Sequence, residues 1–400
     1  MAGPKEHLTR NTKLFGITSL LNDTSSEMII PLFPLFLTEV LFAPVIIVGV
    51  IEAMREFVPD ILSFFSGYYT DKSGKRKRIV LLGYGLSSVM KWFFTILTSY
   101  YQAIAVVFLE RVGKGLRDAP RDSLIVLSEK KERLGIAFGF RRAMDNAGAI
   151  LGPLFASVLL VLLSGSLEEQ YRTIFLIAAF PALLSVFFLF FIKDVKTEKV
   201  EGKVIRHYLN NIPGFKPLLI VISLFAFGQF SAAFFILRSN ELIPLIFVPV
   251  AYLSYNVAYA SFSMPAGHLT DKFGGKKAII LGQTIFLIVL FGFAFTTDLL
   301  QVFVLFILLG GFMALYKVAP QVLLAKQVET KYYATAIGAY KASLGLVAIP
   351  ANLIAGALWD VNIFGLHANF VFSIVMTVIG ILALTILIKE KDGVGNREVS

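Results

Sequence analysis

One apolar stretch of the chain carries an unusual density of ionisable side chains. Within thirteen consecutive positions of the segment 108–127 lie seven of them: Glu110, Arg111, Lys114, Arg117, Asp118, Arg121 and Asp122. Each such charge costs about 2.5–3.5 kcal/mol at the centre of a membrane-spanning helix, so these side chains must face protein, water or a ligand rather than lipid. Most recur at steps of three and four residues, which places them on one side of an α-helix. A charged stripe of this kind indicates a transport pathway.

Carboxylates in a second apolar stretch are the candidates for carrying protons. Asp23 and Glu27 are four residues apart, share a helix face and have no basic residue nearby in the sequence. Burial without a partner favours the protonated form of a carboxyl group, so such a group can exchange a proton in each transport cycle. The other candidates for contact with protons or solute are Glu52, Arg55, Glu56, Arg142, Asp145, Asn146, Lys317 and Lys341.

Acids and bases also alternate at short spacing in these stretches. Pairs such as Glu52 with Arg55, or Arg117 with Asp118, are therefore equally well explained as ion pairs that hold helices together. Lys317 and Lys341 are the clear intramembrane charges of the second half of the chain. They could lock the two halves together or contact an anion.

Composition indicates that these residues sit in a membrane protein. The chain has 400 residues, of which 56% are hydrophobic and 16% charged, whereas soluble domains carry about 25% charged residues. Apolar runs of about 20 residues recur throughout, each long enough to cross a hydrocarbon core about 30 Å thick. The sequence predicts an all-α integral membrane protein with twelve transmembrane helices, at 12–38, 45–69, 79–98, 101–127, 136–163, 171–192, 215–238, 244–269, 278–297, 300–325, 333–358 and 366–388.

The distribution of positive charge predicts the orientation. Connections after the second, fourth, sixth and eighth spans are rich in Lys and Arg, as in KSGKRKR at 72–78, and basic connections stay in the cytoplasm. We therefore expect a multi-pass protein of the cytoplasmic membrane with both termini cytoplasmic. The net charge of +10 then follows from topology rather than from nucleic-acid binding, and the lack of cysteine excludes disulfides and thiolate metal sites.

The two halves of the chain repeat one another. GYYTDKSGKRK at 67–77 matches GHLTDKFGGKK at 267–277, and Ala119-Pro120 recurs as Ala319-Pro320, both at an offset of 200 residues. Two matches in one register indicate a duplicated six-helix unit. We expect an N-terminal six-helix bundle at 1–192, a cytoplasmic linker at 193–213 and a C-terminal six-helix bundle at 214–400.

These motifs resemble those of the major facilitator superfamily (MFS) of secondary transporters, along the whole chain. The repeated loops resemble the family pattern G-x-x-x-D-[RK]-x-G-[RK]-[RK], and RVGKG at 111–115 resembles its fourth-span R-x-x-x-G. GAILGP at 148–153 resembles the fifth-span pattern of antiporters, although Phe155 and Ala156 stand where further glycines are usual. NDTSSEMIIPLFPLF at 22–36 and GKGLRDAPRD at 113–122 resemble a prokaryotic branch of unassigned substrate.

The resemblance implies two pseudo-symmetric bundles that rock about a midplane site and expose it alternately to each side. It also implies gating residues in the repeated loops at 67–77 and 267–277 and in the fifth span. These are Gly67, Asp71, Gly74, Arg76, Gly267, Asp271, Gly274, Gly148, Gly152 and Pro153. The basic loop residues are also explained by topology, and Gly148 and Gly152 by close helix packing.

We predict a secondary active transporter, not an enzyme, that moves a small charged or zwitterionic solute, with proton-coupled export by antiport as the expected mode. The alternatives are proton-coupled uptake of an organic anion through Arg111, Arg117 and Arg121, export of drugs or divalent metals, and a non-transporting membrane sensor. The sequence has no phosphate-binding glycine loop and no histidine cluster, so we expect no cofactor and no bound metal. The expected partners are the solute, protons and lipid, for a monomer.

Overall fold

The computed structural model describes residues 8–130, 133–195, 215–327, 333–363 and 366–388. Side chains are also left undescribed at 71, 215–216, 325–336, 338–339 and 366. The expected linker at 193–213 therefore lies largely outside the described residues. The described chain is almost entirely helical, as the sequence predicts.

Helices of the first half form one bundle. Its spans are α1 (Arg10–Ile29), continued by α2 (Phe33–Leu35) and the π-helix η1 (Phe36–Val40), then α3 (Val45–Ser73), α4 (Arg76–Phe93) with the short η2 (Phe94–Ile96), α5 (Tyr100–Ser128), α6 (Leu134–Leu162) and α7 (Leu167–Phe190).

Helices of the second half form the other bundle. Its spans are α8 (Phe215–Gly228) with α9 (Ala232–Leu242), η5 (Leu245–Phe247) with α10 (Val248–Phe273), α11 (Gly275–Phe295), α12 (Leu299–Gln327), α13 (Tyr333–Ala357) and α14 (Ala368–Leu387). Before α14, β1 (Asn362–Ile363) and β2 (Leu366–His367) pair antiparallel.

Within the described residues, nine helical segments are long and apolar enough to cross a membrane. The three spans outside that set are those of α1, α3 and α5, which carry most of the charged candidates of the first half, while Arg142 and Asp145 lie on α6. Polar helices of this kind must be covered by other protein or face water. The twelve spans of the sequence prediction are therefore all present, and the three least apolar ones all belong to the first bundle.

Two spans that the sequence predicts as continuous are broken. The first is interrupted after Ile29 by Pro31 and Pro34, because proline lacks the N–H that continues a helix. The seventh is interrupted after Gly228, and Ser231 starts the new helix α9, its hydroxyl accepting a hydrogen bond from the backbone N–H of Ala233 at 3.3 Å. The second break leaves a helix N-terminus inside the protein.

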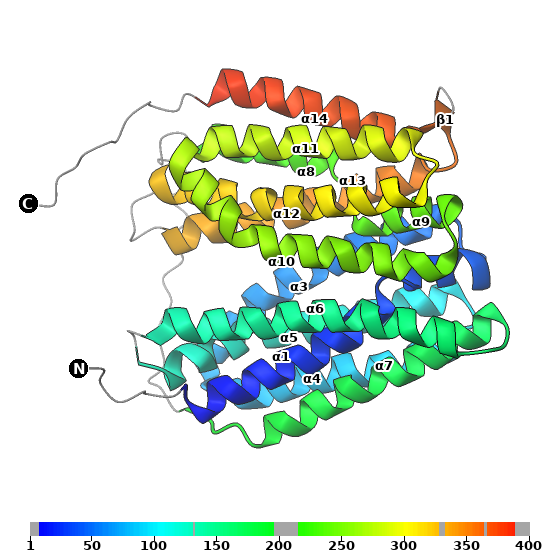
Figure 1. Ribbon diagram of the computed structural model, residues 1–400. Helices are drawn as coiled ribbons and strands as arrows, with labels where there is room; N and C mark the ends of the chain where they lie inside the picture. The colour runs from blue at the N-terminus through cyan, green and yellow to red at the C-terminus, as the bar shows by residue number, and fades with distance from the viewer. Residues whose placement is uncertain (1–7, 131–132, 196–214, 328–332, 364–365, 389–400) are drawn as a thin grey trace, which may run out of the picture.

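Figure 1 shows the two bundles side by side, with the start of α1 and the end of α14 at the same end of the molecule. We call that end the terminal face and the other end the opposite face. Each span reverses the chain, so α3, α5, α7, α10 and α12 also end at the terminal face.

Apolar packing joins the bundles in one half of the molecule only, among the described residues. Toward the opposite face a single core includes Phe36 and Val48 of the first bundle with Phe234 and Trp359 of the second. Toward the terminal face each bundle has a separate core, one around Phe15 and the other around residues such as Leu218. The bundles are thus closed on each other near the opposite face.

Glycines permit the closest approach within this closed half, where α3 crosses α13. A Cβ on Gly49 would overlap the carbonyl oxygen of Asn352, and one on Gly356 would lie 2.8 Å from Ile46 Cα. Ordinary contacts of a Cβ begin at 3.4 Å, so the two backbones touch at a distance that no larger residue allows.

Candidate functional site

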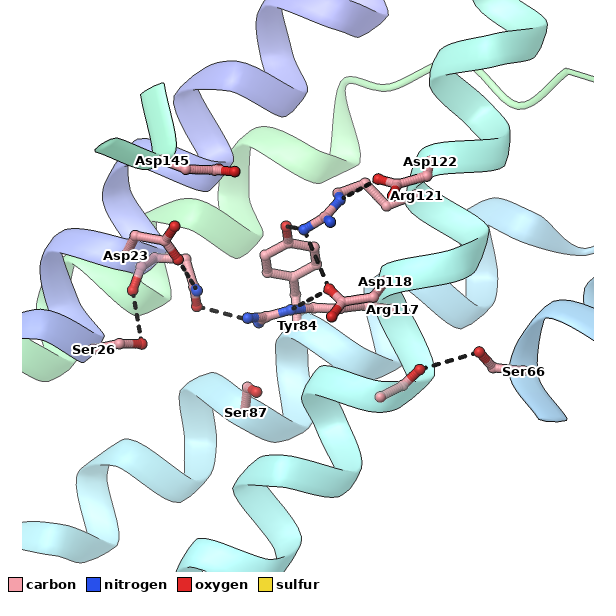
Figure 2. A network of polar contacts seen from close by, with 12 residues as sticks. Asp23, Ser26, Ser66, Tyr84, Ser87, Arg117, Asp118, Arg121, Asp122 and Asp145 are labelled. Carbon is pink, nitrogen blue, oxygen red and sulfur yellow. Dashed lines mark hydrogen bonds and ion pairs between the residues drawn. The ribbon is translucent and has the colours of Figure 1, made fainter. Parts of the chain in front are cut away.

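Most of the charged stripe on α5 is neutralised within the first bundle. Arg121 Nη1 lies 3.3 Å from Asp118 Oδ1, and Arg121 Nε lies 3.0 Å from Asp122 Oδ1. Figure 2 shows Arg117 reaching from α5 across the ring of Tyr84, whose centroid is 4.0 Å from the guanidinium carbon. Arg117 donates to Asn22 Oδ1 at 3.2 Å. These contacts favour the structural explanation for Arg117 and Arg121.

Glu110 and Arg111 lie deeper in the same helix. Arg111 Nε is 2.7 Å from Glu110 Oε2, and both residues are buried. The pair is an ion pair rather than an aligned hydrogen bond, because Arg111 Nε has no hydrogen-bond partner among the described residues. Arg111 also lines a cavity between the bundles, so it is the arginine of the predicted Arg111, Arg117 and Arg121 cluster that borders this space.

Lys91 is a buried base that the sequence reasoning missed. Its side chain on α4 is 2% exposed, and its Nζ donates to Ser26 Oγ at 2.9 Å and to the backbone oxygen of Asn22 at 3.2 Å. The signal was present, since Lys91 is a single charge inside an apolar run, but it has no charged neighbour at helical spacing to mark it.

Asp23 and Glu27 lie on one face of α1, as predicted, and that face meets α6. A Cβ on Gly152 would lie 2.5 Å from Glu27 Cβ, and one on Gly148 would lie 2.9 Å from Asp23 Cβ. The two glycines of the fifth-span motif therefore bring the α6 backbone against α1 at the level of these carboxylates. Pro153 lies within the same helix, which runs past it to Leu162.

Glu27 connects the two bundles. Its Oε2 accepts a hydrogen bond from Asn256 Nδ2 of α10 at 3.3 Å, and the same amide donates to the backbone oxygen of Ala149 at 2.8 Å. Asp23 accepts from Asn22 Nδ2 at 3.2 Å and faces the carboxylate of Asp145 (Figure 2). Neither Asp23 nor Glu27 forms an ion pair among the described residues, which agrees with the lack of a nearby base in the sequence.

Lys114 lies among the acids of the first bundle. Its positive charge attracts the negative charges of the Asp23, Asp60 and Asp118 carboxylates. Asp60 was not among the predicted site residues, although it continues the three-and-four spacing of Glu52 and Glu56 on α3.

Glu52 and Arg55 border the cavity with Arg111. Glu52 Oε1 lies 3.2 Å from Arg55 Nη1, and Glu52 Oε2 accepts a hydrogen bond from Ser231 Oγ of the second bundle at 2.6 Å. The cavity has a volume of about 170 Å³ and is lined by Ile30, Glu52, Arg55, Arg111, Ser231, Ala232, Ala233 and Tyr252. Sequence reasoning found its charged residues but not Ser231, because the helix break that positions Ser231 leaves no charge signal.

Acids and bases face each other across the bundles nearer the terminal face. Glu56 and Asp60 of α3 and Lys317 and Lys341 of α12 and α13 are all exposed. Lys317 is close enough to Glu56, and Lys341 close enough to Asp60, for the opposite charges of each pair to attract. Neither lysine forms an ion pair with a described carboxylate, so the structure holds these opposite charges apart.

Two arginines on α6 take different partners. Arg142 Nη2 donates to the hydroxyl of Tyr259 in the second bundle at 2.7 Å. Arg141 Nη1 lies 3.0 Å from Asp145 Oδ2, and Asn146 beside it is half-buried. Arg142 is thus a contact between bundles, while Arg141 joins the acids of the first bundle.

The repeated loop motifs end corresponding helices. Gly74 follows α3 with φ +70° and Gly274 follows α10 with φ +89°, conformations that favour glycine. Gly67 packs near Ala119, whereas a Cβ on Gly267 would meet open space.

The charged members of these loops are only partly accounted for. The Asp71 side chain lies outside the described residues, and Asp271 is exposed at the end of α10. Arg76 is buried and donates from Nε to Ser123 Oγ of α5 at 2.9 Å. The gating role therefore stays a prediction. Among the described residues no group of three or more His, Asp or Glu side chains is placed to hold a metal ion.

Comparison with known proteins gives matches along the whole chain. The family model of the Major Facilitator Superfamily matches residues 15–254 and 245–399. An uncharacterized MFS-type transporter of Methanocaldococcus jannaschii is 37% identical over 388 residues, which cover 95% of both chains. The multidrug resistance protein MdtH of Photorhabdus laumondii is 29% identical over 133 residues, which are 33% of each chain.

Solved structures share the fold at low sequence identity. A mutant form of the nucleoside transporter NupG superimposes with a TM-score of 0.83 at 12% identity, covering 95% of this chain and 100% of that one. A bacterial homologue of the human lysosomal transporter Spinster, in an inward-facing and unoccupied conformation, gives a TM-score of 0.77 at 13% identity over 96% and 98% of the two chains.

Proposed function

Because the chain belongs to the major facilitator superfamily of membrane transporters, we propose that it is a proton-coupled carrier that exports a small charged or zwitterionic solute by alternating access. Membership makes it a transporter rather than an enzyme. The observation that carries the proposal is the contact between Glu27 and Asn256, because it places a carboxyl group without a basic ion-pair partner at the junction of the two bundles.

Protonation of Glu27 would change that junction. The carboxylate accepts a hydrogen bond from the Asn256 amide, and a charged acceptor makes a stronger hydrogen bond than a neutral one. A proton on Glu27 would therefore weaken the contact and favour separation of α1 from α10. Asp23, one turn away and facing Asp145, is the neighbouring carboxyl group through which a proton could pass.

The basic connections favour a cytoplasmic terminal face in the cytoplasmic membrane, with both termini inside. Since the bundles share a core only near the opposite face, the described arrangement would then open inward. One chain supplies both bundles, and the carrier is expected to work as a monomer.

Two observations support export. The fifth-span motif resembles that of antiporters, and a third of the chain is similar to the multidrug resistance protein MdtH. The cavity with Arg55 and Arg111 favours a second candidate, proton-coupled uptake of an organic anion.

Flux measurements in proteoliposomes test the proposal. Vesicles enclosing a pH indicator are given a panel of charged and zwitterionic solutes under an imposed pH gradient, with vesicle orientation fixed by labelling an introduced cysteine. We expect solute movement to dissipate the gradient in the wild type and not in Glu27→Gln. Glu39→Gln is the matched control, because Glu39 also contacts the second bundle, through Asn240, but lies toward the opposite face. Equal proton movement in wild type and Glu27→Gln would refute coupling through Glu27, and the direction of coupled flux separates export from uptake.

A further inference from the structure

The cavity between the bundles already holds one carboxylate on a set of donors. The side chain of Glu52 is buried and spans from Arg55 of its own helix to Ser231 of the second bundle, at 3.2 and 2.6 Å. Its partners are thus a guanidinium in an ion pair and a hydroxyl that donates a hydrogen bond, two kinds of group that bind carboxylates. The arrangement shows that Arg55 and Ser231 can bind a carboxylate group.

Groups other than Arg55 and Ser231 also bring positive charge to the cavity that holds Glu52. Ser231, Ala232 and Ala233 begin α9 and line the cavity, so the positive end of that helix dipole faces it. Arg111 lines the cavity as well, and the Arg55 side chain is only 8% exposed. The Nε atom of Arg55 is buried and has no hydrogen-bond partner among the described residues, whereas Arg111 Nε is ion-paired with Glu110 Oε2 at 2.7 Å. A buried donor like Arg55 Nε is costly unless a ligand satisfies it.

We propose that this cavity binds one carboxylate of the transported solute, and that Glu52 occupies the place of that carboxylate in the empty carrier. The inference rests on the proposed transport function and adds the chemical class of the solute. The solute carboxylate takes the donors of Arg55 and Ser231, with Arg111 and the start of α9 as further positive groups. Glu52 is displaced, and its link to Ser231, which ties the two bundles together, is broken. Binding of the solute thereby loosens the closed side of the carrier.

Three probes of similar size, one anionic, one neutral and one cationic, test this inference on the purified full-length protein. Cavities of about 150 Å³ accept benzene, so a cavity of 170 Å³ has room for a benzene-sized guest. Benzoate, benzamide and benzylammonium are compared by isothermal titration and by thermal shift at equal ionic strength. We expect benzoate to bind and to raise the unfolding temperature, and the neutral and cationic analogues to do neither. Equal binding of benzamide would overturn the proposal.

Variants then locate the binding site. Arg55→Gln should weaken benzoate binding about tenfold or more, and Ser231→Ala about two- to tenfold, since each removes one hydrogen-bond donor, charged or neutral respectively. Glu52→Gln should strengthen binding about tenfold, because it removes the charged competitor. Arg238→Gln is the matched control for Arg55→Gln, and Glu39→Gln is the matched control for Glu52→Gln, because each removes the same charge at a residue that does not line the cavity. We expect both controls to bind benzoate like the wild type. If Arg55→Gln does not fold, Ser231→Ala and Glu52→Gln decide the question.

Failure of this inference is distinguishable from failure of the proposed transport. Unchanged benzoate affinity in both Ser231→Ala and Glu52→Gln overturns the carboxylate site, whatever the flux assay gives. Benzoate binding with the expected variant pattern, together with proton movement that Glu27→Gln leaves intact, keeps the site and refutes coupling at Glu27.

Discussion

The crossing of α3 and α13 predicts how one added methyl group would shift the carrier between its two states. In Gly356→Ala the new Cβ would lie 2.8 Å from Ile46 Cα, about 0.6 Å closer than the 3.4 Å at which ordinary contact begins. The obstruction is backbone, which cannot rotate away as a side chain can. Overpacking of this kind costs about 1–3 kcal/mol. The cost falls on the state in which the bundles are closed near the opposite face, so the other state should gain about 5- to 150-fold in relative population.

Labelling of an introduced cysteine measures this shift. The chain contains no cysteine, so Ala233→Cys, which lines the cavity and is 4% exposed, gives a single reporter. A membrane-impermeant maleimide applied from the opposite face should react faster when Gly356→Ala is added, by a factor within that range. Gly85→Ala is the matched control, because its Cβ would meet no atom within 4 Å. Unchanged labelling in folded Gly356→Ala, or an equal increase in Gly85→Ala, would show that the contact at Gly356 does not hold the bundles closed near the opposite face.

Two further variants test individual contacts. Lys91→Met should lower the unfolding temperature, since the buried oxygens of Asn22 and Ser26 lose their donor, at a cost of about 1–3 kcal/mol; an unchanged temperature in the purified protein would contradict this. The hydrogen bond to Glu241 raises the pKa of His367 above its ordinary value of about 6.5, so its stabilising contribution is complete below that pH and is lost as the pH rises through the raised pKa. The unfolding temperature of the wild type should therefore fall with rising pH in this window relative to His367→Gln, and parallel pH profiles would show that the pair contributes nothing.

The sequence predicted the architecture and the inward-facing acids because both depend on local pattern. Twelve apolar runs and a repeat at an offset of 200 residues are visible in one dimension, and the spacing of Asp23 and Glu27 places them on one helix face. The same spacing rule predicted the Glu52–Arg55 pair, which the structure contains at 3.2 Å. For Asp118 the sequence analysis named its neighbour Arg117, while the closer partner is Arg121, three residues further on.

Contacts between the bundles could not be predicted in this way. Ser231 meets Glu52, and Asn256 meets Glu27, across about 180 and 230 positions of sequence, and nothing in either local segment encodes the pairing. The break before Ser231 was also missed, because the segment has no proline and its apolar pattern continues through the interruption. Such pairings depend on how two bundles dock, which a helical period does not determine.

Infrared difference spectroscopy of the purified protein between acidic and alkaline buffer tests whether Glu27 carries a proton. The signal of protonated carboxyl groups should change with pH in the wild type. We expect that change to lose one component in Glu27→Gln and to stay intact in Glu39→Gln. A difference spectrum in Glu27→Gln that is identical to that of the wild type would show that Glu27 does not take up a proton.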